Sequence, residues 1–119
     1  MTGARRALGD VGENLAADRY AADGYDILDR NWRCADGELD LVVARGGVVV
    51  FCEVKTRRSD TFGAPFEAVT LTKQRRLRRL ARQWLAEHRG HHREVRFDVA
   101  SVALTRGAAP VVELIEEAF

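Results

Sequence analysis

The chain has 119 residues, of which 46% are hydrophobic and 31% are charged, and its formal net charge is +1. This composition excludes a disordered or collagen-like chain and predicts a single folded domain over residues 1–119, with residues 1–8 as a flexible tail. No apolar run approaches the roughly 20 residues of a membrane-spanning helix, and no signal-peptide pattern opens the sequence. We therefore expect a cytoplasmic protein without a membrane partner.

The first predicted element is a helix that begins at Asp10 and ends at Gly24. The Asp10 carboxylate can cap the helix, and Glu13 three residues later completes a capping-box pattern. Aromatic and branched residues then predict a strand over residues 25–32, and Asp36-Gly37 indicates a turn.

Two further strands are predicted over residues 38–45 and 48–55, with Gly46-Gly47 between them. Two glycines at this place indicate a two-residue hairpin, because both central positions of the favoured turn need positive φ. The strand over residues 48–55 begins with five apolar residues in a row.

The remaining elements follow a loop over residues 56–68. Thr72 is expected to cap a second helix, which Gly90 ends. One face of this helix carries the apolar residues Leu77, Leu80, Ala81, Trp84 and Leu85. Strands are predicted over residues 95–104 and 111–115. The order of helix, three strands, helix and two strands predicts an α/β fold with a mixed sheet flanked by helices.

The charges are unevenly distributed along the chain. Residues 10–40 contain nine acidic residues and three arginines, whereas residues 73–93 contain eight basic residues and one glutamate. This division suits a protein that holds a cation with one part and phosphate groups with another.

The predicted hairpin brings four charged side chains together. Pairing outward from the turn places Asp40 opposite Glu53 and Glu38 opposite Lys55, and residues two apart in a strand point to the same side. Facing carboxylates repel each other, and a divalent cation such as Mg²⁺ removes that cost by binding their oxygens. Lys55 could then orient or deprotonate an attacking water and neutralise charge in the transition state. This arrangement is typical of a phosphodiesterase.

The same four residues also have a structural interpretation. They could form the solvated face of an antiparallel pair, with a salt bridge between Glu38 and Lys55 across the strands. Residues 48–52, however, are apolar at every position, as in a strand that is buried on both faces of its sheet. Charges that begin directly after such a strand indicate a site at the edge of a core.

Two motifs of the hairpin are Gly37-Glu38-Leu39-Asp40-Leu41 and Phe51-Cys52-Glu53-Val54-Lys55. Further blocks extend over most of the chain, and they are Gly12-Glu13, Gly24-Tyr25, Arg30-Asn31, Phe62-Gly63-Ala64-Pro65, Glu67-Ala68-Val69, Lys73 with Arg76-Leu77, and Arg96-Phe97-Asp98-Val99. The hairpin motifs resemble the D…ExK signature of the PD-(D/E)xK nuclease superfamily, which includes restriction endonucleases and archaeal Holliday junction resolvases. The wider pattern resembles the YraN family of small bacterial proteins, a family of predicted endonucleases.

The resemblance implies a restriction endonuclease-like αβββαβ core, in which Asp40 and Glu53 bind Mg²⁺ or Mn²⁺ and Lys55 is catalytic. By the same analogy Glu13 is the acidic residue that junction resolvases add to the metal site, a role compatible with helix capping. We therefore expect a metal-dependent endonuclease that hydrolyses DNA phosphodiester bonds, on branched or otherwise structured DNA. Resolvase-like proteins act as dimers, so a homodimer is a possible assembly.

Basic residues are the candidates for nucleic-acid binding. They are Arg57, Arg58, Lys73, Arg75, Arg76, Arg78, Arg79 and Arg82. The first two follow Lys55 directly, and the others lie on the second helix, where acidic partners are scarce. A solvated loop and a solvated helix face are the structural alternatives. The chain has no recognisable base-reading module, which predicts low sequence specificity.

Other residues have structural interpretations. Asp98 is expected to pair with a neighbouring arginine, and Trp84 to belong to the core. Cys34 and Cys52 are too few for a disulfide framework and lack zinc-site spacing, so both are expected as reduced thiols, with Cys52 in the core. Three histidines are expected at the surface near the end of the second helix, namely His88, His91 and His92.

Two other functions remain open at this point. The first is a noncatalytic nucleic-acid-binding or adaptor protein that keeps the nuclease fold. The second is a purely structural role, in which the hairpin carries surface charge and no active site. Saturable metal binding would separate the enzyme from the purely structural protein.

Overall fold

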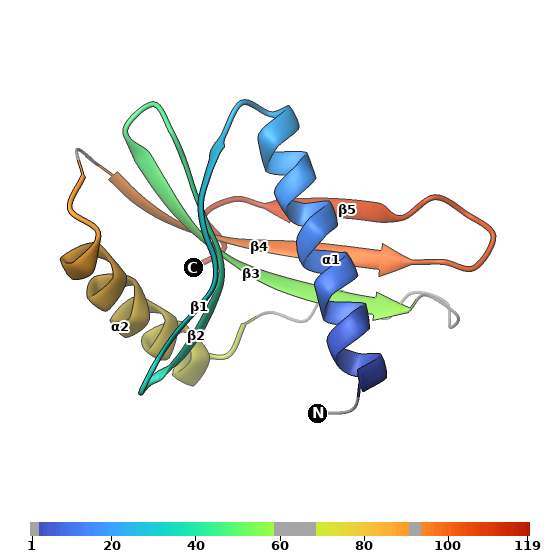
Figure 1. Ribbon diagram of the computed structural model, residues 1–119, viewed down its shortest axis with the longest axis horizontal. Coiled ribbons are helices and arrows are strands. Elements are labelled where there is room, and N and C mark those ends of the chain that lie inside the picture. The colour runs from blue at the N-terminus through green and yellow to red at the C-terminus, as the bar shows by residue number, and fades with distance from the viewer. Residues whose placement is uncertain (1–2, 59–68, 91–93) are drawn as a thin grey trace.

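The structure is a computed structural model, which describes residues 3–58, 69–90 and 94–119. The elements are α1 (Gly3–Ala22), β1 (Asp26–Cys34), β2 (Gly37–Arg45), β3 (Val48–Arg58), α2 (Leu71–Glu87), β4 (Glu94–Leu104) and β5 (Val111–Ile115). The strands form one sheet in the order β1-β2-β3-β4-β5, and the two helices pack on it from opposite sides (Figure 1). The expected order of elements and the mixed α/β fold are confirmed.

The sheet is mixed because only β3 and β4 are parallel among its neighbouring strands. These two strands pair from Val48 and Glu94 to Arg58 and Leu104. A parallel pair needs a crossover connection, and α2 lies in the chain between β3 and β4. The acidic hairpin β2–β3 is therefore fixed on one side by a long parallel ladder.

The turn of the β2–β3 hairpin lies at Gly46 and Gly47, as predicted. Their φ angles are 57° and 84°, in the left-handed region that glycine adopts without steric cost. The expected register is confirmed from the turn outward to the pair of Leu41 and Cys52. In the described chain the ladder ends at that pair, so Asp40 does not face Glu53 as a ladder partner. The two strands separate there.

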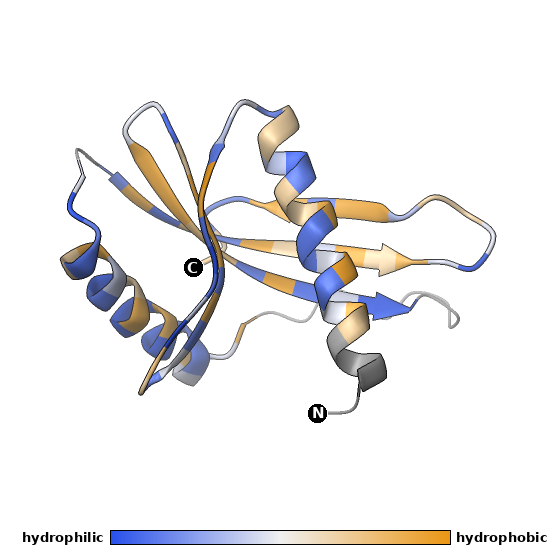
Figure 2. Cartoon of the chain, viewed as in Figure 1, coloured by the Kyte–Doolittle hydropathy of each residue, from blue (hydrophilic) through white to orange (hydrophobic). Residues whose placement is uncertain are grey.

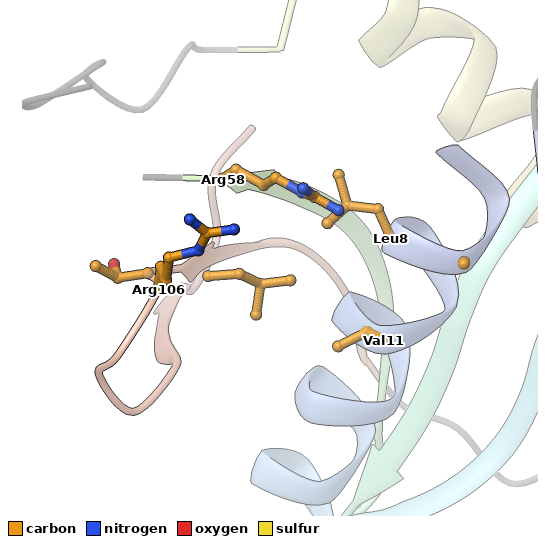
Figure 3. Close-up of a pocket in the computed structure, with 7 residues that line it drawn as sticks. Leu8, Val11, Arg58 and Arg106 are labelled. Carbon is orange, nitrogen blue, oxygen red and sulfur yellow. The ribbon is translucent and has the colours of Figure 1, made fainter. Parts of the chain in front are cut away.

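Strand β3 continues through Arg57 and Arg58, which were expected in a loop, because β4 continues to pair with it. The rest of that loop, residues 59–68, lies outside the described residues. Figure 2 shows β3 changing from hydrophobic near the hairpin turn to hydrophilic at its end. There Arg58 lies with Arg106, Leu8 and Val11 around a cavity of about 590 Å³ (Figure 3).

Helix α1 begins at Gly3, well before the expected start at Asp10. Residues 3–8, expected as part of a tail, therefore belong to the helix, and Asp10 does not cap it. The reason is intrinsic propensity, because alanine, arginine and leucine fill the upstream segment and are strong helix formers.

Helix α1 lies very close to β3 at Gly12. A β-carbon added there would lie 1.7 Å from Oγ1 of Thr56, so only glycine permits this approach. The next residue, Glu13, is buried with 8% of its surface exposed. Gly12 thus brings Glu13 to the sheet.

Helix α2 begins at Leu71, with Thr70 as its cap in place of the expected Thr72. Thr70 is extended, and its hydroxyl accepts a hydrogen bond of 3.2 Å from the backbone N–H of Lys73. The helix ends at Glu87, just before the expected stop at Gly90. The predicted apolar face is confirmed, since Leu77, Leu80, Ala81 and Trp84 are buried and Leu85 is partly buried.

Two cores lie on the two faces of the sheet. The core under α2 contains Phe51, whose ring centroid lies 5.6 Å from that of Trp84. The core under α1 contains Tyr20 and Cys52, and Cys52 is 3% exposed as expected for a core thiol. Successive residues of β3 enter different cores, which confirms that this strand is buried on both faces. No helix of the described residues is long and apolar enough to cross a bilayer.

Candidate functional site

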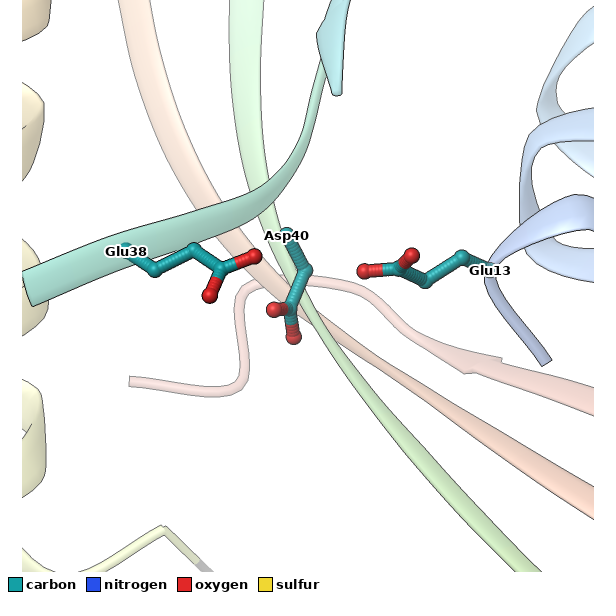
Figure 4. Close-up of side chains that lie close together, drawn as sticks. All are labelled: Glu13, Glu38 and Asp40. Atoms are coloured by element: carbon teal, nitrogen blue, oxygen red, sulfur yellow. The ribbon is translucent and has the colours of Figure 1, made fainter. Parts of the chain in front are cut away.

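Three carboxylates converge where β2 leaves β3. Glu38 and Asp40 come from β2, Glu13 comes from α1, and one oxygen of each lies within 4.8 Å of the others (Figure 4). The two β2 residues point to the same side because they are two apart in a strand. Glu13 reaches them because Gly12 lets α1 lie close to β3.

Asp40 is placed between the separating strands. Its Oδ2 accepts a hydrogen bond of 2.9 Å from the backbone N–H of Val54. The pKa of Asp40 is raised from its ordinary value of 3.8 to about 7, chiefly by burial and next by the negative charge of Glu53, while the Val54 hydrogen bond acts in the opposite direction. Glu13 and Glu38 add smaller contributions in the same direction as burial. The surroundings of Asp40 therefore favour its neutral form over the anion.

Glu13 is also in unfavourable surroundings for a carboxylate. Burial raises its pKa, while a hydrogen bond with Asn31 and the charge of Arg30 lower it. Asn31 has a φ of 52°, a conformation that asparagine tolerates better than most residues. The expected helix-capping role of Glu13 is wrong, because Glu13 lies in the interior of α1.

Glu53 forms an ion pair with Lys73 of α2. The Glu53 side chain is 10% exposed and that of Lys73 is 33% exposed. Glu53 lies outside the cluster of Glu13, Glu38 and Asp40, but its charge is the second-largest cause of the raised pKa of Asp40. The structure thus places Glu53 next to that cluster and pairs it with the positively charged side chain of Lys73.

Lys55 lies two residues beyond Glu53 on β3, at the pair with Ser101 of β4. It is partly buried, and by strand alternation it points to the same side of the sheet as Glu53. Glu38 lies 3.5 Å from Arg33 in an ion pair across the β1–β2 hairpin, and the expected salt bridge between Glu38 and Lys55 stays a prediction.

Sequence reasoning omitted two contacts of this site. It named Glu38 on the hairpin but did not group it with Glu13, although its spacing from Asp40 already placed those two on one side. It proposed phosphate contact for Lys73 and did not foresee the ion pair of Lys73 with Glu53. No local pattern predicts that pairing, because it joins residues of different elements through the packing of α2 on the sheet.

The basic residues occupy two regions. Arg57 is partly buried, and its Nε has no hydrogen-bond partner among the residues that the structure describes. Arg58 is exposed beside it. The exposed face of α2 carries Arg75, Arg76, Arg78, Arg79 and Arg82. The guanidinium of Arg78 lies 4.8 Å from the ring centroid of Phe97, so this arginine also covers the core.

A second buried carboxylate has different surroundings. Asp98 on β4 accepts two hydrogen bonds of 2.9 Å from Arg96 and one of 2.7 Å from the Tyr20 hydroxyl. The backbone N–H of Glu117 donates a further hydrogen bond of 3.1 Å. The expected structural role of Asp98 beside an arginine is confirmed.

The aromatic and histidine predictions have mixed outcomes. Trp84 is 2% exposed and belongs to the core, as expected. His88 is partly exposed and stacks on Trp84, with ring centroids 4.2 Å apart. Cys34 is a free, partly buried cysteine. His91 and His92 lie outside the described residues.

Comparison with known proteins identifies relatives along nearly the whole chain. A protein of Beutenbergia cavernae named UPF0102 protein is 56% identical over 110 residues, which cover 92% of this chain and 93% of the relative. A UPF0102 protein of Nocardia farcinica is 51% identical, covering 98% and 92%, and one of Frankia casuarinae is 53% identical, covering 98% of both chains. The profile described as "Uncharacterised protein family UPF0102" matches residues 12–102. The chain therefore belongs to the UPF0102 family.

Proposed function

We propose that this protein is a metal-dependent endonuclease that hydrolyses DNA phosphodiester bonds, with branched or otherwise structured DNA as its substrate. The observation that carries the proposal is the environment of Asp40. A partly buried carboxylate with a pKa near 7 lies beside Glu53 and within a cluster with Glu13 and Glu38. Lys55 follows Glu53 at the spacing of a D…ExK nuclease motif.

The donor atoms fit a hard divalent cation. Carboxylate oxygens are the ligands that Mg²⁺ and Mn²⁺ prefer, and Asp40, Glu53 and Glu13 would hold the ion. A bound ion of this kind supplies a more acidic water and neutralises charge on a phosphate. Burial is the largest cause of the raised pKa of Asp40, but the neighbouring carboxylates also contribute, and the negative charges that disfavour its anion favour a bound cation.

The protein's own groups contribute orientation and charge. The Val54 N–H fixes one oxygen of Asp40, so the carboxylate keeps one direction in the gap between β2 and β3. The Lys55 ammonium offers three donors, which suit it to orient an attacking water and to stabilise negative charge on the phosphate. The α2 arginines, with Arg57 and Arg58, supply the positive surface for the DNA backbone.

The decisive experiment combines metal binding with cleavage. Protein freed of metal by a chelator is titrated with Mg²⁺ and Mn²⁺ by calorimetry, and its cleavage of a four-way junction is compared with that of a linear duplex. Wild type should bind and cleave, Asp40→Asn should do neither, and Lys55→Ala should bind metal without cleaving. Glu113→Gln, an exposed carboxylate on β5, is the matched control and should behave as wild type. Absence of saturable metal binding in wild type would reject the proposal.

A noncatalytic nucleic-acid-binding protein is the second candidate function. The exposed arginines of α2 favour it, because phosphate binding by such a face needs no metal. Replacing Arg75, Arg79 and Arg82 together by Gln should reduce the slope of log K against log salt by about 0.9 for each lost phosphate contact. DNA binding that shows this slope change, in a wild type that binds no metal and cleaves nothing, would favour the second candidate.

A further inference from the structure

The ion pair between Glu53 and Lys73 occupies one of the carboxylates that the proposed function assigns to the metal. We propose that Lys73 is a tethered cation that competes with the divalent metal for Glu53 and must leave it before the site is filled. This inference rests on the proposed function. It adds a residue that controls metal affinity without being a metal ligand.

Burial explains why the negative charge of Glu53 is stable only with a positive charge beside it. Its side chain is only 10% exposed and lies beside Asp40, so an unpaired negative charge there would be costly. Lys73 forms an ion pair with this carboxylate in the structure. A divalent metal that binds Glu53 neutralises the same carboxylate with two positive charges, where Lys73 offers one. The ammonium group of Lys73 and the metal then repel each other.

The position of Lys73 lets it leave without moving the helix. Its backbone is fixed in the first turn of α2, where its N–H donates to Thr70. Its side chain is a flexible four-carbon stem that ends in a point charge and is 33% exposed. Arg96 on Asp98 is the opposite case, since two hydrogen bonds hold its planar group and only 15% of that side chain is exposed. Rotation about the bonds of the lysine stem is therefore enough to free Glu53.

The effect of this competition on the apparent dissociation constant of the metal can be calculated. The apparent dissociation constant of the metal is the intrinsic constant divided by the fraction of protein in which Glu53 is free. If Lys73 holds Glu53 about nine-tenths of the time, the metal binds about tenfold more weakly than it would without Lys73.

The test uses the full chain, treated with a chelator and then titrated with Mg²⁺ or Mn²⁺ by calorimetry. Lys73→Met should bind the metal about tenfold more tightly than wild type. Arg89→Met removes one exposed positive charge beyond the C-terminal end of α2 and is the matched control, which should keep the wild-type affinity. If Lys73→Met does not fold, Lys73→Gln keeps a polar side chain at the same position and replaces it.

A metal-free measurement tests the pair itself. Without metal, Lys73→Met should lower the melting temperature, because Glu53 loses its partner, and Glu53→Gln in the same protein should restore it. A wild type that binds metal while Lys73→Met binds with equal or lower affinity would overturn the competition and leave the proposed function standing. Absence of metal binding in both proteins would overturn both.

Discussion

Asp40 and Asp98 lie on strands of the same sheet and have opposite surroundings. Asp98 is fully buried and receives hydrogen bonds from Arg96, from Tyr20 and from a backbone N–H. Asp40 receives a hydrogen bond from the backbone N–H of Val54, while burial and then the negative charges of Glu53, Glu13 and Glu38 raise its pKa. A buried carboxylate with a full set of donors holds the fold together. A carboxylate that lies among other carboxylates is less stable as an anion, and under the proposed function a bound cation would relieve this cost.

The strongest test of this comparison is Asp98→Ala. It leaves the Arg96 guanidinium without its main partner and the buried Tyr20 hydroxyl without an acceptor. We expect a loss of about 3–5 kcal/mol in the free energy of unfolding, the usual cost of breaking a buried charge pair. Urea unfolding in the presence of a chelator measures it. Asp26→Ala, an exposed aspartate on β1, is the control, and an equally small loss in both variants would contradict the structural role of Asp98.

Asp40→Asn should have the opposite sign in metal-free protein. The pKa of Asp40 is about 7 when folded and has an ordinary value of 3.8, so the contribution of Asp40 to wild-type stability is greatest below pH 4 and falls as the pH rises to 7. The loss is about 1.4 kcal/mol for each unit of pKa, or a few kcal/mol in all. Asn cannot ionise and still accepts the Val54 hydrogen bond.

The difference in unfolding free energy between Asp40→Asn and wild type should therefore grow between pH 4 and pH 7. Chemical unfolding at several pH values, with a chelator present, gives this difference directly. Added Mg²⁺ should stabilise wild type alone at pH 7, because it binds only the folded site. If Asp40→Asn is strongly destabilised at every pH, the prediction is wrong, and Asp40 has a structural role like that of Asp98.

The smallest effect is expected from Gly12→Ala, which tests how α1 holds Glu13 near Asp40. The added methyl group would overlap Thr56, so α1 has to move away from β3 at a cost of about 1–3 kcal/mol. Thr56→Gly in the same protein should recover part of the loss. Gly9→Ala is the control, because a β-carbon there meets nothing within 4 Å and alanine favours the helix. Thermal unfolding and Mg²⁺ affinity are the two measurements. An unchanged Mg²⁺ affinity in Gly12→Ala would contradict the assignment of Glu13 to the metal site.

Local patterns predicted the β2–β3 turn and the apolar face of α2. Gly46-Gly47 can adopt the positive φ angles that a two-residue hairpin turn needs, and the spacing of Leu77, Leu80 and Trp84 indicates one buried helix face. The starts of both helices were wrong, because a capping residue signals a possible start and upstream helix propensity decides the actual one. Helix α1 continues past Asp10 to Gly3, and α2 begins at Leu71 because Thr70, not Thr72, is the cap.

The sequence named the charged residues that the structure places near one another, but it did not give their geometry, and the roles of these residues stay predictions. The spacing of Asp40, Glu53 and Lys55 follows from strand alternation, which sequence alone supplies. The end of the ladder at Leu41 and Cys52 does not follow from it, because it depends on how the sheet twists under two helices. The Lys73 contact with Glu53 depends on the docking of α2 and was not predictable for the same reason.

The parallel pairing of β3 with β4 has a consequence for the order in which the protein folds. Strands β1, β2 and β3 are joined by short turns, whereas β4 pairs with β3 only after the chain has passed through α2. Contacts between distant residues form late because closing a long loop costs entropy. The acidic residues Glu13, Asp40 and Glu53 all precede α2, so we expect them to assemble before Lys73 arrives. A divalent cation present while the chain folds would then meet Glu53 before its internal competitor does.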